Sequence, residues 1–182
     1  MIGNLTKCWH ERLFRISREK VVKCRSDLPL EMLPITKDNV EWVRTLRGQE
    51  YEKQFVDQLA MGDFGYYSCV NGKAVGYGWV KYPGSNDYFF KIEEGCRYLC
   101  RFFVHESMRG HGIYPELICA LIEHETEADV FHIAVERGNM ASEQGLKKVG
   151  FEFQKEFSFL RLFRRTVNKY KLKSQGECEI NE

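Results

Sequence analysis

The chain has 182 residues, of which 43% are hydrophobic and 29% are charged, and its formal net charge is +1. This length is enough to bury a full core and is typical of one domain, while the near-neutral charge gives no electrostatic case for a nucleic-acid partner. No apolar run approaches the ~18 residues that a membrane span needs, and the first residues lack the apolar stretch of a signal peptide, so we expect no membrane partner.

The first thirty residues are predicted to form an extension of the main domain. Hydrophobic residues alternate around Phe14, Ile16 and Val21, and residues 17–20 have the composition of a turn. This pattern predicts a small β-hairpin within residues 12–25. We expect an N-terminal extension at residues 1–30, the main domain at residues 31–167 and a polar C-terminal tail at residues 168–182.

The main domain is predicted to begin with a strand, two helices and a hairpin. The expected elements are a strand at 31–35, helices at 40–46 and 51–59, and strands at 64–70 and 74–82. The helices are predicted from hydrophobic residues that recur with a helical period. The last two strands are joined by Asn71-Gly72, which is the strongest short signal for a β-hairpin.

The second half of the chain alternates strands with helices. The expected elements are a long strand at 97–104, a helix at 115–124, a strand at 130–135, a helix at 140–149, a strand from 151 and a last extended run at 157–167. A strand–turn–helix–strand unit places its two strands in parallel. The order therefore predicts a mixed α+β domain, with a largely antiparallel sheet and a parallel portion around this unit.

Seven cysteines are scattered along the chain. An odd number of unclustered cysteines is typical of reduced thiols, which predicts a cytoplasmic protein. Cys96 and Cys100 fall on one predicted strand, but no second pair of cysteine or histidine residues stands at zinc-ligand spacing. We therefore expect no metal site.

The most informative stretch is the glycine turn Arg109-Gly110-His111-Gly112-Ile113-Tyr114, which lies between a predicted strand and a predicted helix. The first turn of a helix presents unpaired backbone N–H groups at the positive end of the helix dipole, and such a surface binds anions, phosphates above all. Glycines let the backbone approach the anion closely, and Arg109 adds a charge-assisted donor. The sequence therefore predicts a phosphate-binding turn here.

The strand, the glycine turn and a second motif together resemble the GCN5-related N-acetyltransferase (GNAT) superfamily of acetyl-CoA-dependent acyltransferases. The family signature is a strand followed by Arg/Gln-x-x-Gly-x-Gly/Ala at the start of a helix, and here Phe102-Phe103-Val104 precedes the glycine turn. The second motif is Asn139-x-Ala141-Ser142, followed one helix later by Gly150-Phe151. The resemblance covers roughly residues 64–153. It implies a GNAT-like three-layer fold with a mostly antiparallel central sheet, a splayed central strand and flanking helices.

The resemblance also implies how acetyl-CoA would bind. The CoA pyrophosphate would lie over the N–H groups of the glycine turn, the pantetheine arm would pair with the exposed backbone of residues 102–104, and Asn139 would hydrogen-bond that arm. An N–H in the splay would stabilise the oxyanion, and the acetyl group would pass directly to an amine. The implied cofactor-binding residues are Phe102, Phe103, Val104, Arg109, Gly110, His111, Gly112, Ile113, Tyr114 and Asn139.

Three positions depart from the family pattern. Tyr114 stands where the signature ends in glycine or alanine, and it would either narrow the cofactor groove or bond a phosphate. Leu146 stands where many members have a tyrosine that protonates the leaving thiolate, and Ala134 where some have a carboxylate. The resemblance therefore assigns neither the acid nor the base.

Three residues are predicted to act in proton transfer, because each is of a type that can exchange a proton. His105 follows the central strand, Glu136 ends the next strand, and Tyr82 belongs to an aromatic cluster before the glycine turn. The alternatives are that His105 is a solvated link residue, that Glu136 forms an ion pair with Arg137 or a nearby lysine, and that Tyr82 is part of the sheet core.

Other side chains also have two interpretations. Arg101 either binds an anionic group of the acceptor or faces solvent, and Trp79 either lines the acceptor pocket or belongs to the core. His132 is expected to be structural. The adjacent Phe89 and Phe90 in a polar loop predict an acceptor-binding loop.

Together these observations predict an acetyl-CoA-dependent N-acetyltransferase that transfers an acetyl group directly to the amine of a small molecule such as an amino sugar. The alternatives are a protein acetyltransferase acting on lysine or an N-terminal amine, and a non-catalytic acyl-CoA-binding module. We expect acetyl-CoA as cosubstrate, no metal, and a monomer or a homodimer.

Overall fold

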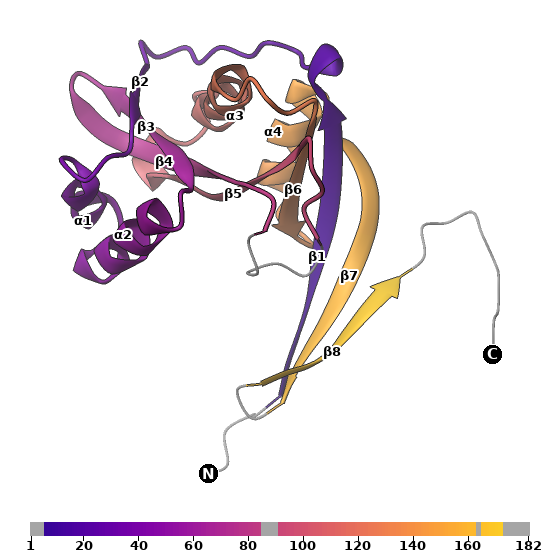
Figure 1. The fold of residues 1–182 in the computed structure, drawn as a ribbon. Helices are drawn as coiled ribbons and strands as arrows, with labels where there is room; N and C mark the ends of the chain where they lie inside the picture. The colour runs from indigo at the N-terminus through magenta and orange to yellow at the C-terminus, as the bar shows by residue number, and fades with distance from the viewer. Residues whose placement is uncertain (1–5, 85–90, 163–164, 173–182) are drawn as a thin grey trace, which may run out of the picture.

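The computed structural model describes residues 6–84, 91–162 and 165–172. In these ranges the chain forms an eight-stranded sheet with the order β2-β3-β4-β5-β6-β1-β7-β8 and with helices on both faces (Figure 1). The strands are β1 (Thr6–Ser17), β2 (Glu31–Pro34), β3 (Phe64–Val70), β4 (Lys73–Lys81), β5 (Cys96–Val104), β6 (Val130–Glu136), β7 (Glu152–Leu162) and β8 (Arg165–Leu172). The helices are α1 (Val43–Arg47), α2 (Glu52–Ala60), α3 (Ile113–His124) and α4 (Met140–Val149), with short 3-10 turns at Arg18–Lys20, Val40–Trp42, Gln49–Tyr51 and Glu106–Met108. No helix in the described ranges is long and apolar enough to cross a membrane.

The hairpin of β3 and β4 forms where the sequence predicts it. The two strands pair in antiparallel register from Phe64 opposite Val80 to Val70 opposite Lys73. Asn71 and Gly72 make the turn, with φ values of 50° and 72°. Two positive φ values suit the right-handed twist of the flanking strands, so this local signal was sufficient to place the hairpin.

The two largest clusters of buried side chains lie on opposite faces of the sheet. The helices α1 and α2 cover one face, where Phe55 packs edge-on against Trp79 with 5.1 Å between ring centroids. The helices α3 and α4 cover the other, where Leu117 and Leu146 share a cluster with Phe131. The three-layer α+β architecture that the resemblance implied is therefore confirmed.

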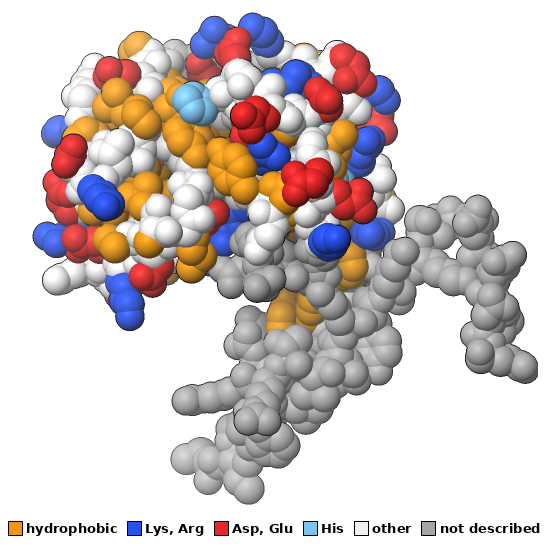
Figure 2. Space-filling view, viewed as in Figure 1, with side chains coloured by type: hydrophobic (Ala, Val, Ile, Leu, Met, Phe, Trp, Pro, Cys, Tyr) orange, Lys and Arg blue, Asp and Glu red, His pale blue; other side chains and the backbone are white. Residues whose placement is uncertain are grey.

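The surface side chains are of mixed character. Figure 2 shows acidic and basic side chains interspersed around a central area of hydrophobic side chains on the viewed face. The residues drawn on this face therefore form no basic stripe of the kind that follows a nucleic-acid backbone.

The strands β5 and β6 are parallel neighbours that separate along their length. They pair only over Cys96–Leu99 and Val130–Ile133, yet β5 continues to Val104 and β6 to Glu136. Beyond the last pair, the backbone of β5 is released from this neighbour. The splayed central strand is therefore confirmed.

A β-bulge lies on the other side of β5, at the level where the splay begins. The register between β4 and β5 shifts between Tyr77 and Trp79, and Arg101 has a φ of 54°. A positive φ is unfavourable for a residue with a side chain and persists only where the surrounding structure imposes it. The bulge re-aims the second half of β5.

The N-terminal hairpin predicted within residues 12–25 is wrong. Residues 6–17 instead form one strand, β1, which lies between β6 and β7 and pairs antiparallel with both. Leu13 is buried on one face of the sheet and Phe14 and Ile16 on the other. The alternation thus belongs to an inner strand covered on both faces, whereas Val22, which would have continued a hairpin, is 55% exposed.

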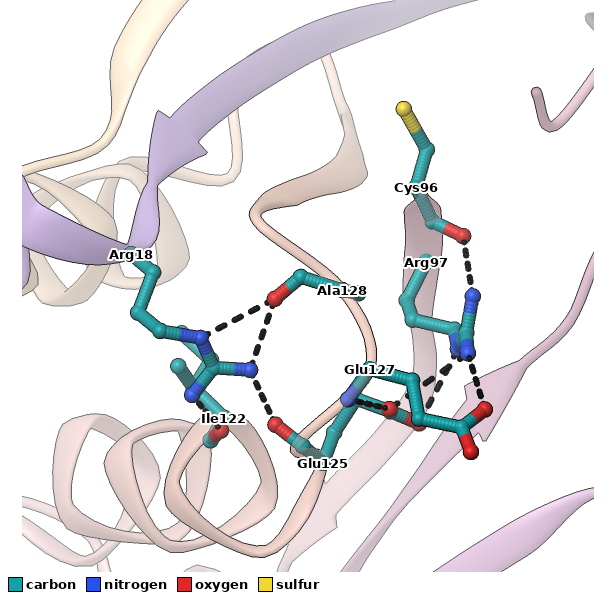
Figure 3. Close-up of polar contacts among 7 residues, drawn as sticks. All are labelled: Arg18, Cys96, Arg97, Ile122, Glu125, Glu127 and Ala128. Atoms are coloured by element: carbon teal, nitrogen blue, oxygen red, sulfur yellow. Dashed lines mark hydrogen bonds and ion pairs between the residues drawn. The ribbon is translucent and has the colours of Figure 1, made fainter. Parts of the chain in front are cut away.

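The end of β1 is fixed to the C-terminus of α3 by Arg18 (Figure 3). Its guanidinium donates to the carbonyls of Ile122 at 2.9 Å and Ala128 at 2.7 Å, and also to the carbonyl of Glu125. These carbonyls belong to the end of α3 and the loop after it, where backbone acceptors lack helical partners. A cation also interacts favourably with the negative end of the helix dipole.

The C-terminal strands differ in position from the prediction. β7 runs from Glu152 to Leu162 without the break expected before residue 157, and β8 follows from Arg165 to Leu172. β8 is the edge strand of the sheet. The sheet therefore includes strands from both the predicted extension and the predicted tail.

Candidate functional site

The glycine turn joins the splayed half of β5 to α3. Gly110 and Gly112 have φ values of 89° and 75°, and Gly112 is the N-cap residue of α3. No side chain among the described residues caps this end of the helix. The backbone N–H groups of the first turn are therefore available to an anion at the positive end of the helix dipole.

The segment between β1 and β2 packs against the outer side of the glycine turn. The carbonyl of His111 accepts hydrogen bonds from the Ser26 hydroxyl at 2.6 Å and the Asp27 N–H at 3.2 Å. The His111 ring is 2.9 Å from the Asp27 carboxylate, measured between Nδ1 and Oδ1. The side chain of His111 is thus turned toward this segment, while the role predicted for His111 belongs to its backbone N–H.

The side chain of Arg109 lies over the end of β5. Its Nε donates to the carbonyl of Val104 at 3.3 Å, and the side chain is exposed. Arg109 therefore occupies the junction between the strand and the turn, with its charge at the surface where a phosphate would approach.

The side chain of Tyr114 packs at the contact between two helices. Its ring lies between α3 and α4, where a Cβ built on Gly145 would be only 2.6 Å from the ring carbon Cδ1. The ring also meets Phe102 edge-on at 5.2 Å, and its hydroxyl is hydrogen-bonded to Ser142. Burial raises the pKa of Tyr114 above its ordinary value. Gly145 thus makes room for a tyrosine where the family signature has a glycine or an alanine.

Asn139 stands at the start of α4 and acts as its N-cap. The Oδ1 atom accepts a hydrogen bond from the N–H of Ser142 at 3.2 Å. This is the usual role of asparagine at a helix start. The Nδ2 amide group of the same side chain carries the N–H donors that Asn139 has to offer.

Phe102 and Phe103 point to opposite faces of the sheet. Phe102 meets Tyr114 on the side of α3 and α4, and Phe103 stacks on Tyr77 at 5.7 Å on the side of α1 and α2. Both rings are therefore engaged in packing, and residues 102–104 present their backbone to the splay.

The three predicted catalytic residues do not come together. His105 lies directly after β5, where its Nδ1 is 2.8 Å from the Ser107 hydroxyl. Glu136 is exposed at the end of β6. Tyr82 lies near the opposite end of β5, where the strand begins. The Arg97 guanidinium is 4.6 Å above its ring, and its hydroxyl is hydrogen-bonded to Glu125.

The position of Tyr82 is a correction to the prediction. Its contacts are with the start of β5 and with the residue after α3, so the length of α3, about 18 Å, separates it from the glycine turn. Aromatic composition drew attention to Tyr82, but composition carries no information about which end of a strand a residue occupies. The geometry assigns it to the packing of Arg97.

The other residues with two interpretations are placed as follows. Trp79 is fully buried against Phe55, so it belongs to the core. Arg101 is exposed at the bulge. Burial lowers the pKa of His132 to about 4, so its ring is neutral at physiological pH. Residues 89 and 90 lie outside the described residues.

One titratable side chain near the splay was not among the residues predicted from the sequence. Glu11 on β1 lies directly opposite Glu136 on β6. Burial and the Glu136 charge together raise the pKa of Glu11 from 4.5 to about 7. No local sequence signal could have identified it, because its neighbour is supplied by the pairing of β1 with a distant strand.

Comparison with family models gives one match. Residues 32–151 match the model described as "Acetyltransferase (GNAT) family". No curated protein sequence matches this chain.

Several solved structures have a similar fold. One is an acetyltransferase of the GNAT family from Colwellia psychrerythraea, at 15% identity and a TM-score of 0.63, with 92% of this chain and 57% of that chain covered. Another is a tandem GNAT protein from the clavulanic acid biosynthesis pathway, at 13% identity and a TM-score of 0.61, with 93% and 55% covered. The aminoglycoside N-acetyltransferase AAC(6')-Iy, bound to a bisubstrate analogue, has 16% identity and a TM-score of 0.52, with 68% and 91% covered. The chain thus spans little more than half of the first two proteins, and these identities indicate a shared fold.

Proposed function

The chain belongs to the acetyltransferase (GNAT) family, and on that premise we propose that it transfers an acetyl group from acetyl-CoA to the amine of a small acceptor. The observation that carries the proposal is the uncapped start of α3 at Gly112, directly after a strand that has separated from its parallel neighbour. A phosphate site and a free strand edge thus lie end to end.

The two parts of this arrangement suit the two parts of CoA. The N–H groups at the start of α3, with Arg109 beside them, would bind the pyrophosphate. The backbone of residues 102–104 would hydrogen-bond the pantetheine arm in place of the missing strand neighbour. The Nδ2 amide group of Asn139 would donate to the same arm, since Oδ1 of Asn139 is used as a helix cap.

A small amine, such as an amino sugar, is the acceptor that we propose. The fold of AAC(6')-Iy supports this choice, since that protein binds an analogue of CoA joined to acetylneamine. Reaction would proceed by direct attack of the neutral amine on the thioester, with a backbone N–H of the splay stabilising the oxyanion.

A titration of acetyl-CoA followed by calorimetry tests the cofactor site. Gly112→Ala places a Cβ 3.2 Å from the Arg25 carbonyl at a φ of 75°, so the turn must shift, and we expect acetyl-CoA binding to weaken by about tenfold or more. Gly62→Ala is the matched control, because Gly62 also has a positive φ, of 80°, but has open space and lies at the end of α2. Equal binding by both variants would contradict the proposed site.

A non-catalytic acyl-CoA-binding module is the second candidate function, and two side chains favour it. Leu146 is fully buried in the core, and Ala134 has no group that exchanges protons. Both stand where family members place catalytic groups. Release of free CoA from acetyl-CoA over a panel of amines distinguishes the candidates, since a binding module would bind acetyl-CoA and release none.

A further inference from the structure

Glu11 and Glu136 form a pair of carboxylates at the open end of the splay. The two residues are direct partners in the antiparallel register of β1 and β6, which brings their Cβ atoms to about 5 Å of each other. The pairing of β5 with β6 has already ended at Ile133. The pair therefore lies beyond the point at which the central strands separate.

Both carboxylates lie on the face of the sheet that α1 and α2 cover. Side chains two residues apart on a strand lie on the same face of the sheet. Glu136 therefore lies on the same face as Ala134, and Glu11 lies on the same face as Leu13. Ala134 packs with the clusters of Leu13 and of Tyr98 on this side. This is the face opposite to the one on which Arg12 binds Glu143 of α4.

The surroundings of Glu11 favour a proton near neutral pH. Glu136 faces it from β6, and Tyr98 on β5, which interacts electrostatically with Glu11 and is hydrogen-bonded to the backbone of Ala134, is uncharged at this pH because its pKa is raised. On β7 its register partner is Phe157, whose ring has the Lys155 ammonium 5.2 Å away. Like charges placed directly opposite one another on a sheet are unfavourable, and partial burial adds to that cost. A carboxyl group in this setting can exchange a proton with an amine at physiological pH.

We propose that Glu11 is the general base of acetyl transfer, and that Glu136 attracts the acceptor ammonium toward it. This inference rests on the proposed function. It assigns the proton transfer to β1, a strand that the resemblance does not cover. It also supplies a base in a chain whose Leu146 and Ala134 cannot exchange protons.

The acceptor ammonium gives one proton to the Glu11 carboxylate and becomes a neutral amine. The amine lone pair attacks the thioester carbonyl carbon, a C–N bond forms, and the C–S bond breaks with its electron pair on sulfur. The second proton leaves the nitrogen and reaches the thiolate, giving free CoA. Glu11 then releases its proton to water, so the products are the amide, CoA and one proton.

The test is the pH dependence of CoA release with an amine that the wild-type protein acetylates. From about pH 5 to about pH 9, kcat/KM should rise with the ionisation of Glu11, and Glu11→Gln should abolish this rise and lower the rate by about 100-fold or more. Glu136→Gln removes the neighbouring charge, so it should move the rise to lower pH. Glu19→Gln, at an exposed carboxylate in the turn after β1, is the control and should leave the profile unchanged.

The outcomes separate the two proposals. A wild-type protein that releases no CoA with any amine of the panel overturns the proposed function, and the role of Glu11 with it. A wild type that turns over while Glu11→Gln keeps both its rate and its acid limb overturns the role of Glu11 alone. Calorimetry with acetyl-CoA checks that Glu11→Gln retains the folded cofactor site. If that variant does not fold, Glu11→Asp should keep the rise of kcat/KM with pH, at a reduced rate. A rise that stays at the same pH in Glu136→Gln would refute the interaction between the two carboxylates.

Discussion

The contact between Tyr114 and Gly145 allows us to predict how the free energy of unfolding changes when Gly145 is replaced. Two opposing effects act at this helix position. Replacing a glycine by alanine inside a helix usually stabilises a protein by up to about 1 kcal/mol. At Gly145 the added Cβ would lie 2.6 Å from Cδ1 and 3.0 Å from Cε1 of the Tyr114 ring. Overpacking of this kind costs about 1–3 kcal/mol. We therefore expect Gly145→Ala to lower the free energy of unfolding by about 1 kcal/mol.

A double-mutant cycle isolates the cause. In a Tyr114→Ala background the ring is gone, so Gly145→Ala should become stabilising, and the coupling energy between the two sites should be about 2 kcal/mol. The measurement is urea unfolding followed by circular dichroism. Gln144→Ala, at the neighbouring exposed position of α4, controls for helix propensity. The reasoning is refuted if Gly145→Ala stabilises the protein while Tyr114 is present.

Two further predictions concern stability. Arg18→Ala should lower the free energy of unfolding by about 2–3 kcal/mol, because the guanidinium binds carbonyls at the end of α3. Lys20→Ala, at an exposed position of the same turn, should change it by less than about 0.5 kcal/mol, and equal losses in urea unfolding would argue against this anchor. Because the pKa of Glu11 is raised from 4.5 to about 7 in the folded state, the folded protein binds this proton more tightly, and stability falls as pH rises across that window. Glu11→Gln should therefore stabilise the protein by about 1–2 kcal/mol at pH 8, a value that allows for solvent screening of a half-buried group. Near pH 4, where Glu11 is protonated, the same substitution should leave Tm unchanged. A gain in Tm that is equal at both pH values would contradict this reasoning.

The local elements could be predicted from the sequence because their signals are local. Asn71-Gly72 specifies a turn by its own φ preferences, and the start of α3 is specified by Gly110 and Gly112 within the turn itself. The residues predicted to bind the cofactor lie on these elements, so their positions in the fold follow from local signals, while their role in binding stays a prediction.

The rest depends on which segments meet across the sheet, and composition does not encode that. The alternation around Phe14 and Ile16 predicts a strand correctly, but it is equally compatible with a hairpin and with an inner strand. Glu11 gains its significance only when β6 places Glu136 opposite to it. Tyr114 departs from the family signature, and only the structure shows that Gly145, on another helix, leaves space for its ring.

The position of β1 in the sheet has a consequence for how the protein is made. β1 is synthesised before the other described strands, whereas its two neighbours, β6 and β7, follow only after β2 to β5. Until β6 and β7 have been made, β1 lacks both of its neighbours, and unpaired strand edges are the kind of surface through which chains aggregate. Pairing between such distant segments also slows folding. We therefore expect this part of the sheet to be completed only once β7 has emerged, when β1 can pair with both of its neighbours.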